Sequence, residues 1–260
     1  MPAAHTFTKI IQLSDCHLFA DKTKSGYQGV NPYQTLKRII HTLENSSEIE
    51  SGSLILVTGD ISGDDSKQSY QHFYSLVEPL LAHNTLRVIP GNHDNNIHYQ
   101  EVLGQWHLQA EQPLETHNWV INGLDTRIAG IKGAKGEVKA DELTFIEKHI
   151  TDRPAKHHLL ALHHHPIASD SWMDKHELIG SNMLLAWLAQ QPAINGLLHG
   201  HIHHPLRRTT NEGVPIAGAP STAWQWAMTQ EFGVTQESAG YQIITLNNNG
   251  TIDCEVRRIE

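Results

Sequence analysis

Short apolar runs with the composition of β-strands recur from one end of the chain to the other. They are Lys9–Leu13, Leu54–Thr58, Leu86–Ile89, Arg127–Ile131, His158–Leu162, Gly196–Leu198, Tyr241–Leu246 and Ile252–Val256. Amphipathic segments between them predict helices, which are Pro32–Glu44 after a capping Asn31, Lys67–Leu81 after Ser66, Asn95–Leu103, Asp141–Ile150 and Asn182–Gln190. Strands that alternate with helices in this way pair in parallel.

The order of these elements predicts an α/β fold. The last third of the chain is richer in strands and turns, for example at Asn247–Gly250, and therefore predicts a second sheet packed on the first. We expect a four-layer α/β/β/α sandwich with two mixed β-sheets. No internal repeat or long linker interrupts the 260 residues, so residues 1–260 are predicted to form a single domain.

Charge and composition narrow the classes of function. The chain carries 19 basic and 28 acidic side chains, and its formal net charge of -9 argues against a protein that binds nucleic acid by neutralising phosphates. No apolar run reaches the roughly 20 residues of a membrane-spanning helix, and the N-terminus has no basic segment followed by an apolar one. We therefore expect a cytoplasmic protein with no nucleic-acid partner and no membrane partner.

The two cysteines do not predict a disulfide framework. Cys16 and Cys254 lie near opposite ends of the chain, and Cys16 stands between Asp15 and His17. Side chains alternate along an extended segment, so Asp15 and His17 point to one side and Cys16 to the other. We expect Cys16 to be buried in the core.

Polar motifs follow five of the apolar runs. They are Asp15-Cys16-His17, Gly59-Asp60, Gly91-Asn92-His93-Asp94, His163-His164-His165 and Gly200-His201-Ile202-His203. Carboxylate, imidazole and amide groups are the ligands that a pair of hard or borderline cations requires, with one carboxylate in contact with both ions. Glycine beside Asp60, Asn92 and His201 allows sharp turns, so that short side chains can reach a shared cleft at the edge of the sheet. The pattern predicts a two-metal phosphoesterase site.

In their order and spacing these blocks resemble the signature of the calcineurin-like metallophosphoesterases. Within that superfamily the chain is most similar to the class III 3′,5′-cyclic AMP phosphodiesterases of bacteria, from Ile11 to about Gly250. The similarity includes Ser14-Asp15-Cys16-His17-Leu18-Phe19, Leu162-His163-His164-His165-Pro166 and Ser171-Trp172-Met173-Asp174. The order of five blocks is far more specific than any single block.

The resemblance implies roles for individual residues. One metal ion would be bound by Asp15, His17, Asp60 and His203, and a second by Asp60, Asn92, His163 and His201. Asp60 would then bridge the two ions. The substrate would contact His17, Asn92, His93 and His203, and His93 would be the catalytic residue that donates a proton or hydrogen bond to the leaving oxygen.

The implied reaction is hydrolysis of 3′,5′-cyclic AMP to 5′-AMP by a hydroxide that bridges the metals, with the ribose 3′-oxygen as leaving group. The implied cofactors are two divalent ions, with Fe and Mn preferred and Zn compatible with the same nitrogen and oxygen ligands. The expected partner is a small-molecule cyclic nucleotide, and a homodimer is left open.

Several positions allow two interpretations. His163 is the preferred ligand of its triplet, with His164 as the main rival, because adjacent side chains face opposite ways. Asp94 would orient His93 or cap a helix, whereas Asp64, Asp65 and Asp174 are expected to cap helices or to face solvent. The aromatic segments 164–180 and 221–240 would wall a binding cleft, or instead plug the core or form an oligomer contact.

Competing functions remain to be separated. A broader phosphodiesterase acting on 2′,3′-cyclic nucleotides or glycerophosphodiesters would use the same metal site, and a non-catalytic scaffold would keep the fold alone. Scaffolds usually lose ligands, and none is missing here. Protein phosphatases carry Gly-Asp-x-Val-Asp-Arg-Gly where this chain has Gly59-Asp60-Ile61-Ser62-Gly63-Asp64, and lipid-A-pathway diphosphatases carry Arg at the position of His93. Both of these classes are disfavoured.

Overall fold

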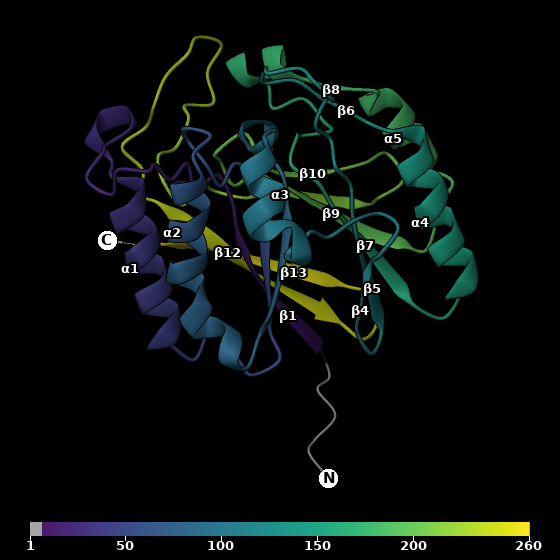
Figure 1. Ribbon diagram of the computed structural model, residues 1–260. Coiled ribbons are helices and arrows are strands. Elements are labelled where there is room, and N and C mark those ends of the chain that lie inside the picture. The colour runs from purple at the N-terminus through teal and green to yellow at the C-terminus, as the bar shows by residue number, and fades with distance from the viewer. Residues whose placement is uncertain (1–6, 260) are drawn as a thin grey trace.

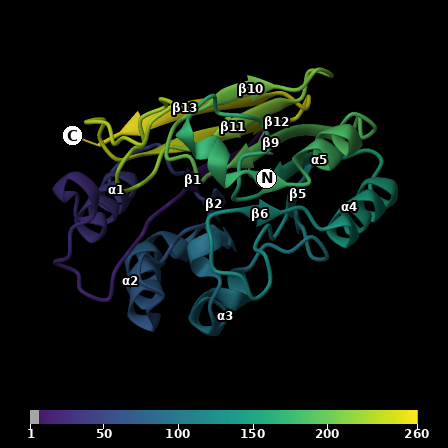
Figure 2. The ribbon, with the colours of Figure 1, turned by 90° about the horizontal axis from the view of Figure 1, so that it is seen from above.

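Two β-sheets pack face to face in the computed structural model, which describes residues 7–259, and helices cover their outer faces. In both ribbon views α1, α2 and α3 lie together on one side and α4 and α5 on the other (Figures 1 and 2). The helices are α1 (Pro32–Glu44), α2 (Lys67–Val77), α3 (Ile97–Leu103), α4 (Ala140–Asp152) and α5 (Ser181–Leu188). The predicted α/β/β/α order is confirmed.

The first sheet has the strand order β13-β12-β1-β2-β3. Its strands are β1 (Phe7–Leu13), β2 (Leu54–Thr58), β3 (Thr85–Ile89), β12 (Gly240–Asn247) and β13 (Ile252–Arg258). β1, β2 and β3 pair in parallel, with Ile11 opposite Ile55 and Val57 opposite Val88. β12 runs antiparallel to β1 and β13 antiparallel to β12, so the sheet is mixed.

The second sheet has the order β10-β11-β9-β7-β5-β4. Its strands are β4 (Leu114–Glu115), β5 (Trp119–Gly123), β7 (His157–Ala161), β9 (Ile194–His199), β10 (Arg207–Thr209) and β11 (Pro215–Gly218). The four inner strands are parallel and the two edge strands are antiparallel. A separate two-stranded ladder joins β6 (Gly136–Glu137) to β8 (Leu178–Ile179).

Three hydrophobic layers follow from this arrangement. Between the sheets, Leu56 and Ile89 of the first sheet pack with Ile121 and Leu159 of the second. The outer faces of the two sheets pack against α1 to α3 and against α4 and α5, respectively. Strands that are buried on both faces carry apolar residues at successive positions, and this explains the uninterrupted run of β2.

The helix starts follow the predicted caps. Asn31 Oδ1 accepts the backbone N–H of Gln34, and Ser66 Oγ accepts that of Ser69. α2 ends at Val77, earlier than predicted, and the chain continues as a 3₁₀ helix over Glu78–Ala82, which contains a proline at its start. Further 3₁₀ helices are Tyr27–Gly29, Asn92–Asp94, Gly104–Trp106 and Trp172–His176.

The predicted strand Arg127–Ile131 is wrong. This segment is irregular and turns at Gly130, whose φ is 71°. The Arg127 guanidinium binds the Asp125 carboxylate at 2.6 Å and donates to the carbonyl of Asp94, so polar contacts hold the segment beside the strand-end loops. The apolar pattern alone could not separate this loop from the true strand β5, which precedes it.

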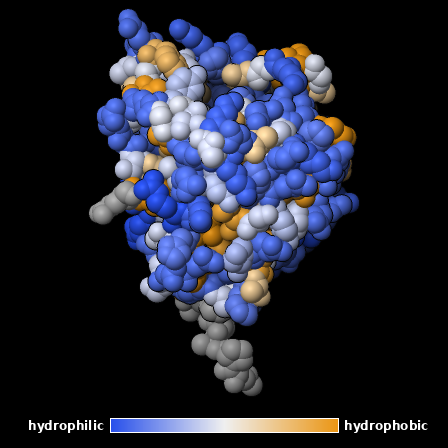
Figure 3. All heavy atoms as spheres, turned by 60° about the vertical axis from the view of Figure 1, so that its left-hand side comes forward, coloured by the Kyte–Doolittle hydropathy of each residue, from blue (hydrophilic) through white to orange (hydrophobic). Residues whose placement is uncertain are grey.

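Hydrophilic residues cover most of the face shown in Figure 3, and hydrophobic residues form scattered patches between them. Among the helices of residues 7–259, none has both the length and the apolar character needed to cross a membrane.

Candidate metal centre

All seven predicted metal ligands follow the carboxyl ends of parallel strands. Asp15 and His17 come after β1, Asp60 after β2 and Asn92 after β3, all from the first sheet. The other three come from the second sheet: His163 follows β7, and His201 and His203 follow β9. Because these strand ends lie at one edge of the sandwich, the structure brings the seven side chains together.

The backbone at this edge is unusual. Asp15, His17, Asp60, His201 and His203 have φ angles of 54°, 45°, 52°, 69° and 46°. This left-handed region is uncommon for residues with a Cβ and costs of order 1–3 kcal/mol per residue, and it persists only where the surroundings enforce it. Strain is therefore concentrated at the predicted ligands.

Hydrogen bonds and close packing hold these loops together. The backbone N–H groups of Asp15 and His17 donate to the carbonyls of Gly59 and Asp60, each at 2.9 Å. Gly59 has a φ of 91°, in agreement with the predicted sharp turn. Gly91 serves another purpose, because a Cβ there would lie 2.2 Å from Asp60 Oδ1. Its lack of a side chain allows two ligand loops to touch.

Asp60 lies between two groups of ligands. Its Oδ2 is 3.9 Å from His17 Nε2 and 3.4 Å from His163 Nε2. On the first side, His17 Nε2 and His203 Nε2 are 3.0 Å apart, and Asp15 Oδ1 is 3.4 Å from His203 Nε2.

On the second side, His163 Nε2 lies 3.2 Å from Asn92 Oδ1 and 3.2 Å from His201 Nδ1. Each predicted group therefore forms a compact set of donor atoms, and Asp60 is shared between the two sets.

The imidazole rings are oriented as metal ligands require. His163 Nδ1 lies 2.7 Å from the carbonyl of Thr58, and His203 Nδ1 lies 2.9 Å from that of Trp224. A carbonyl only accepts, so each Nδ1 carries the proton, and each Nε2 points into the cluster. Facing nitrogens only about 3 Å apart repel unless a proton or cation lies between them, and the donor set therefore fits two metal ions.

Ionisation states at the centre agree with this fit. Burial and the adjacent His203 lower the pKa of His17 to about 3, and burial lowers the pKa of His201 well below its usual range. Burial opposes ionisation of Asp60, but the electrostatic attraction of the neighbouring imidazoles, led by His163, is together stronger than this effect of burial. The pKa of Asp60 therefore lies well below its usual value. Burial likewise opposes protonation of His163, yet Asp60 raises the pKa of His163 to about 9. The almost fully buried carboxylate of Asp60 thus requires a cation beside it, which is a proton or a metal ion.

The geometry distinguishes the members of the histidine triplet. His163 directs Nε2 at Asp60 and Asn92, whereas His164 binds Thr126 Oγ1 through Nδ1 at 2.7 Å. His164 Nε2 is buried without a hydrogen-bond partner in the described part of the chain, close to His163 and His201. His165 pairs with Asp174 at 3.3 Å. The preference for His163 agrees with these contacts.

His93 occupies the open side of the centre. Its backbone N–H donates to Asp60 Oδ1 at 2.8 Å, and its ring meets the ring of His17 edge-on at 5.0 Å. The side chain of His93 is exposed, unlike those of the buried imidazole ligands. A ring nitrogen of His93 nevertheless lies within 4.8 Å of donor atoms of His17 and Asp60, so this ring borders the cluster from its open side.

Asp94 makes no hydrogen bond to the ring of His93 and does not cap α3, whose cap is Asn96, but it closes a capping box on the 3₁₀ helix Asn92–Asp94. Its carboxylate accepts the backbone N–H groups of Ile61, Ser62 and Gly91 and the hydroxyl of Tyr70. Burial raises the pKa of Asp94 because it disfavours the charged carboxylate. The four donors satisfy the hydrogen-bonding capacity of this buried group. Asp94 joins the Asp60 loop to the Asn92 loop.

The remaining polar candidates have structural contacts. Asp64 accepts from Ser66 and from the backbone of Ala20, and Asp65 pairs with Lys132 at the surface. Asp174 caps the 3₁₀ helix Trp172–His176 by a capping box with Ser171.

Cys16 is fully buried, as predicted, and burial raises the pKa of its thiol to about 12.

Sequence reasoning missed the carbonyls of Thr58 and Trp224 and the side chain of Ser14, whose hydroxyl donates to Asp15 Oδ2 at 2.6 Å. Backbone carbonyls have no residue signature, so only the fold reveals them. Ser14 directly precedes the first motif, and its position beside Asp15 was the available signal.

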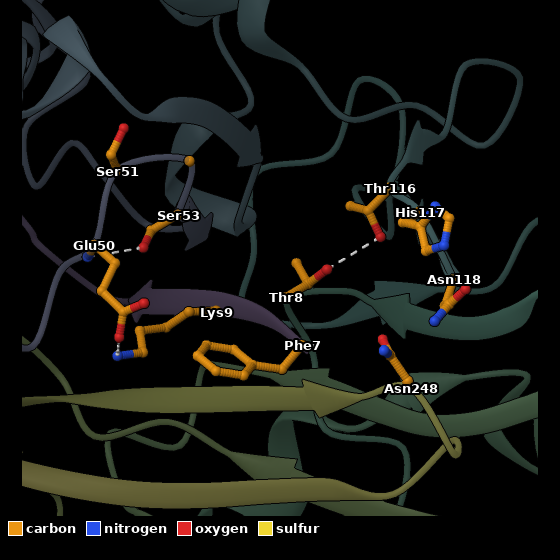
Figure 4. A pocket seen from close by; sticks show the side chains of 11 residues that line it. Phe7, Thr8, Lys9, Glu50, Ser51, Ser53, Thr116, His117, Asn118 and Asn248 are labelled. Atoms are coloured by element: carbon orange, nitrogen blue, oxygen red, sulfur yellow. Dashed lines mark hydrogen bonds and ion pairs between the residues drawn. The ribbon is translucent and has the colours of Figure 1, made fainter. Parts of the chain in front are cut away.

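A hollow lies at the amino ends of the parallel strands, away from the metal centre at their carboxyl ends (Figure 4). It measures about 390 Å³ and is lined by the start of β1, residues 50–53 and residues 116–118. Lys9 pairs there with Glu50, and Thr8 donates to Thr116. None of the metal-ligand groups found within residues 7–259 lies in this hollow.

Comparison with protein families agrees with this geometry. The family model described as calcineurin-like phosphoesterase matches residues 8–205 of the chain. The chain belongs to this family. The family has a dinuclear metal site, and the structure of this chain contains clusters of Asp and His side chains.

Curated relatives in the calcineurin-like phosphoesterase family extend over nearly the whole chain. The 3′,5′-cyclic adenosine monophosphate phosphodiesterase CpdA of Escherichia coli (strain K12) is 31% identical, over 99% of this chain and 92% of that protein. The protein of the same name from Pseudomonas aeruginosa is 31% identical, over 100% of this chain and 93% of that one. A solved dimetal phosphatase from Danio rerio superposes with a TM-score of 0.66 at 11% identity, over 97% of this chain and 99% of that one, and shares the fold.

Proposed function

We propose that this protein is a metal-dependent phosphodiesterase that hydrolyses 3′,5′-cyclic AMP to 5′-AMP. The observation that carries the proposal is the position of Asp60, whose Oδ2 lies between His17 Nε2 and His163 Nε2. A shared carboxylate between two donor sets is the arrangement that two-metal hydrolases of phosphate esters require. The printed names of the full-length relatives support cyclic AMP as substrate.

Seven residues would hold the ions. Asp15, His17, Asp60 and His203 would bind the first, and Asp60, Asn92, His163 and His201 the second. When bound, two divalent ions would supply Lewis acidity toward the phosphoryl oxygens and an activated water. Fe and Mn are our candidates, and Zn accepts the same ligands.

The chain's own residues would orient the ester and handle the proton. We assign contact with the phosphate to His17, Asn92 and His203 of the donor cluster, and the backbone N–H of His93 donates to Asp60 Oδ1. As water adds to phosphorus, the P–O3′ bond breaks and the departing 3′-oxygen takes a proton. We assign this proton to His93, whose exposed ring lies beside the centre, because an alkoxide leaves poorly without protonation.

The test is a comparison of substrates with purified protein in Mn²⁺. We expect kcat/KM for cyclic AMP to exceed that for cyclic GMP, 2′,3′-cyclic AMP and a glycerophosphodiester, and chelation to abolish turnover. Bis-p-nitrophenyl phosphate provides a reference for metal-dependent activity. Equal values for all the diesters would reject the cyclic AMP assignment, and inactivity with every divalent metal would favour a scaffold.

A further inference from the structure

A cleft of about 460 Å³ opens directly beside the metal centre. It is lined by His17 and His93 of the centre, by Phe19 and residues 24–27, and by Trp224 and Trp226. Pockets of this size hold small organic ligands. A diester whose phosphate lies at the metal centre would therefore place one of its substituents in this cleft.

The cleft walls are fixed to the metal centre. Trp224 stacks on His17, with ring centroids 5.0 Å apart and an interplanar angle of 23°, while its carbonyl accepts from His203. Trp226 stacks on His203 at 4.7 Å and 21°. Trp224 and Trp226 thus line the cleft, and both also pack in a buried apolar cluster with Ile202, so segment 221–240 has both of the roles considered for it within one chain.

The loop that carries Tyr27 is held against these tryptophans. A Cβ at Gly26 would lie 2.2 Å from Trp224 Cζ3, so the loop backbone lies directly on the indole. Gln28 Nε2 donates to the carbonyl of Val234 at 2.9 Å, which ties the loop to segment 221–240. The position of Tyr27 is therefore set before any ligand arrives.

Tyr27 is nevertheless half exposed, at 48%. The rings of Trp224, Trp226 and Phe232 meet it at 60°, 78° and 59°. No aromatic ring in residues 7–259 stacks parallel on Tyr27, so this arrangement is open to a planar ligand. Aromatic side chains held in this way are platforms for nucleobases.

A cation completes the cleft. Lys24 Nζ lies 4.1 Å from the ring centroid of Phe19 and interacts electrostatically with the exposed Asp21 carboxylate of the same loop. An ammonium group only donates hydrogen bonds, and the ring nitrogens and carbonyls of nucleobases accept them. A planar ring bearing acceptors fits this combination better than an aliphatic substituent does.

We infer that this cleft binds the nucleobase of the substrate, with Tyr27 as the stacking residue and Lys24 as a donor to an acceptor on the base. The inference rests on the proposed phosphodiesterase function and adds the residues that select its substrate. Tyr27 and Lys24 determine specificity, whereas the reacting atoms remain with the metal ligands and His93.

The kinetic test compares cyclic AMP with the 3′,5′-cyclic phosphate of methyl riboside, which lacks the base. In the wild type we expect a higher kcat/KM for cyclic AMP. Tyr27→Ala should lower the ratio of kcat/KM for cyclic AMP to kcat/KM for the base-free compound by about 5- to 100-fold, mainly through a higher KM for cyclic AMP. Tyr27→Phe, which keeps the aromatic ring, should keep most of the wild-type ratio. Phe145→Ala removes an exposed aromatic ring of α4 and should leave the ratio unchanged.

Lys24 has a matched control in its own loop. Lys24→Gln should lower the same ratio several-fold, whereas Lys22→Gln should not, because Lys22 lies over Tyr33 outside the cleft. A ratio that is unaffected by both Tyr27→Ala and Lys24→Gln overturns the inference while leaving the phosphodiesterase activity in place.

A binding measurement separates this inference from the proposed activity. Calorimetric titration of the Mn²⁺-loaded protein should show tighter binding of 5′-AMP than of ribose 5-phosphate, and Tyr27→Ala should remove most of the difference. If the wild type does not hydrolyse cyclic AMP but keeps this preference, the proposed function fails and the base cleft stands. If 5′-AMP and ribose 5-phosphate bind equally, the base cleft is wrong.

Discussion

At the scale of single residues, the site depends on short side chains held in strained backbone. Asp60 is the most informative case. It has a φ of 52°, its Oδ1 accepts the backbone N–H of His93, and its Oδ2 faces both ligand sets. The carboxylate is almost fully buried, so the protein tolerates its charge only with cations beside it. These contacts lead to two predictions at single positions.

Asp60→Asn should lower the occupancy of both metal positions and abolish hydrolysis, because an amide supplies neither the charge nor the shared oxygen that two cations need. Metal content by mass spectrometry and turnover of bis-p-nitrophenyl phosphate measure the two effects. Asp64→Asn, in the same loop but outside the cluster, is the matched control. Two bound ions and normal turnover in Asp60→Asn would show that Asp60 does not bridge.

His93→Ala should spare metal binding and lower kcat for cyclic AMP by about 10²- to 10⁴-fold, since the departing alkoxide loses its proton donor. The loss should be much smaller for bis-p-nitrophenyl phosphate, whose nitrophenolate leaves without protonation. Steady-state kinetics on both substrates distinguish the roles. Equal losses would assign His93 to binding or to positioning.

At the scale of secondary-structure elements, the site is made by loops that follow parallel strands and touch one another. Asp94 joins two of these loops through backbone N–H groups, and Gly91 allows them to approach. The strand ends were predictable from apolar runs, but the contacts between loops were not, because they depend on the order of strands in each sheet. A prediction about Gly91 follows from this close approach.

Gly91→Ala should disturb the metal centre without adding any polar group. The new Cβ would lie 2.2 Å from Asp60 Oδ1 and 2.4 Å from Asp60 N, so one ligand loop must move. A shift of about 1 Å can cost on the order of 10²-fold in rate, and we expect a loss of that size in kcat/KM together with weaker metal retention. Gly133→Ala, where the nearest atom is 4.0 Å away, should behave as wild type. Wild-type kinetics in Gly91→Ala would contradict this account.

The first turn of α4 predicts a pH dependence of stability away from the metal centre. Glu142 accepts the backbone N–H of Asp125 at 2.9 Å, and burial raises the pKa of Glu142 from 4.5 to about 7. A raised pKa means that the folded state prefers the protonated form. The protonated Glu142 side chain therefore contributes its full stabilisation below about pH 4.5, and this stabilisation is lost as the pH rises through about 7.

Glu142→Gln keeps the acceptor oxygen and removes the titration. At pH 8 we expect the variant to be more stable than wild type by about 1–3 kcal/mol, with a much smaller difference at pH 4.5. Urea denaturation at the two pH values measures this, and Glu111→Gln at an exposed position is the control. A difference that does not change with pH would exclude Glu142 as the titrating group.

At the scale of the whole molecule, the two sheets contribute the two halves of one centre. The first sheet supplies Asp15, His17, Asp60 and Asn92, and the second supplies His163, His201 and His203. The apolar layer between the sheets therefore holds the two donor sets in register. Metal binding and folding should be linked as a consequence.

Removal of the metals should lower the melting temperature without unfolding the protein, because the three hydrophobic layers remain. Metal at about 100 times its Kd adds about 2.7 kcal/mol per site and about 5 kcal/mol for two sites, so we expect a fall of about 10–20 °C after chelation, with recovery in excess Mn²⁺. Scanning calorimetry checks both steps. Identical melting temperatures with and without chelator would mean that the folded protein binds no metal under those conditions.

The sequence by itself determined the α/β class, the helix starts at Asn31 and Ser66, and the identity of the polar motifs, because local periodicity and caps act over a few residues. Only the tertiary structure decided which nitrogen of His163 faces the cluster, what Asp94 binds, and that the segment after Asp125 is a loop rather than a strand. These features depend on partners such as the carbonyls of Thr58 and Trp224, which lie far away along the chain and have no side-chain signature. Contacts of this kind exist only once the sheets have packed.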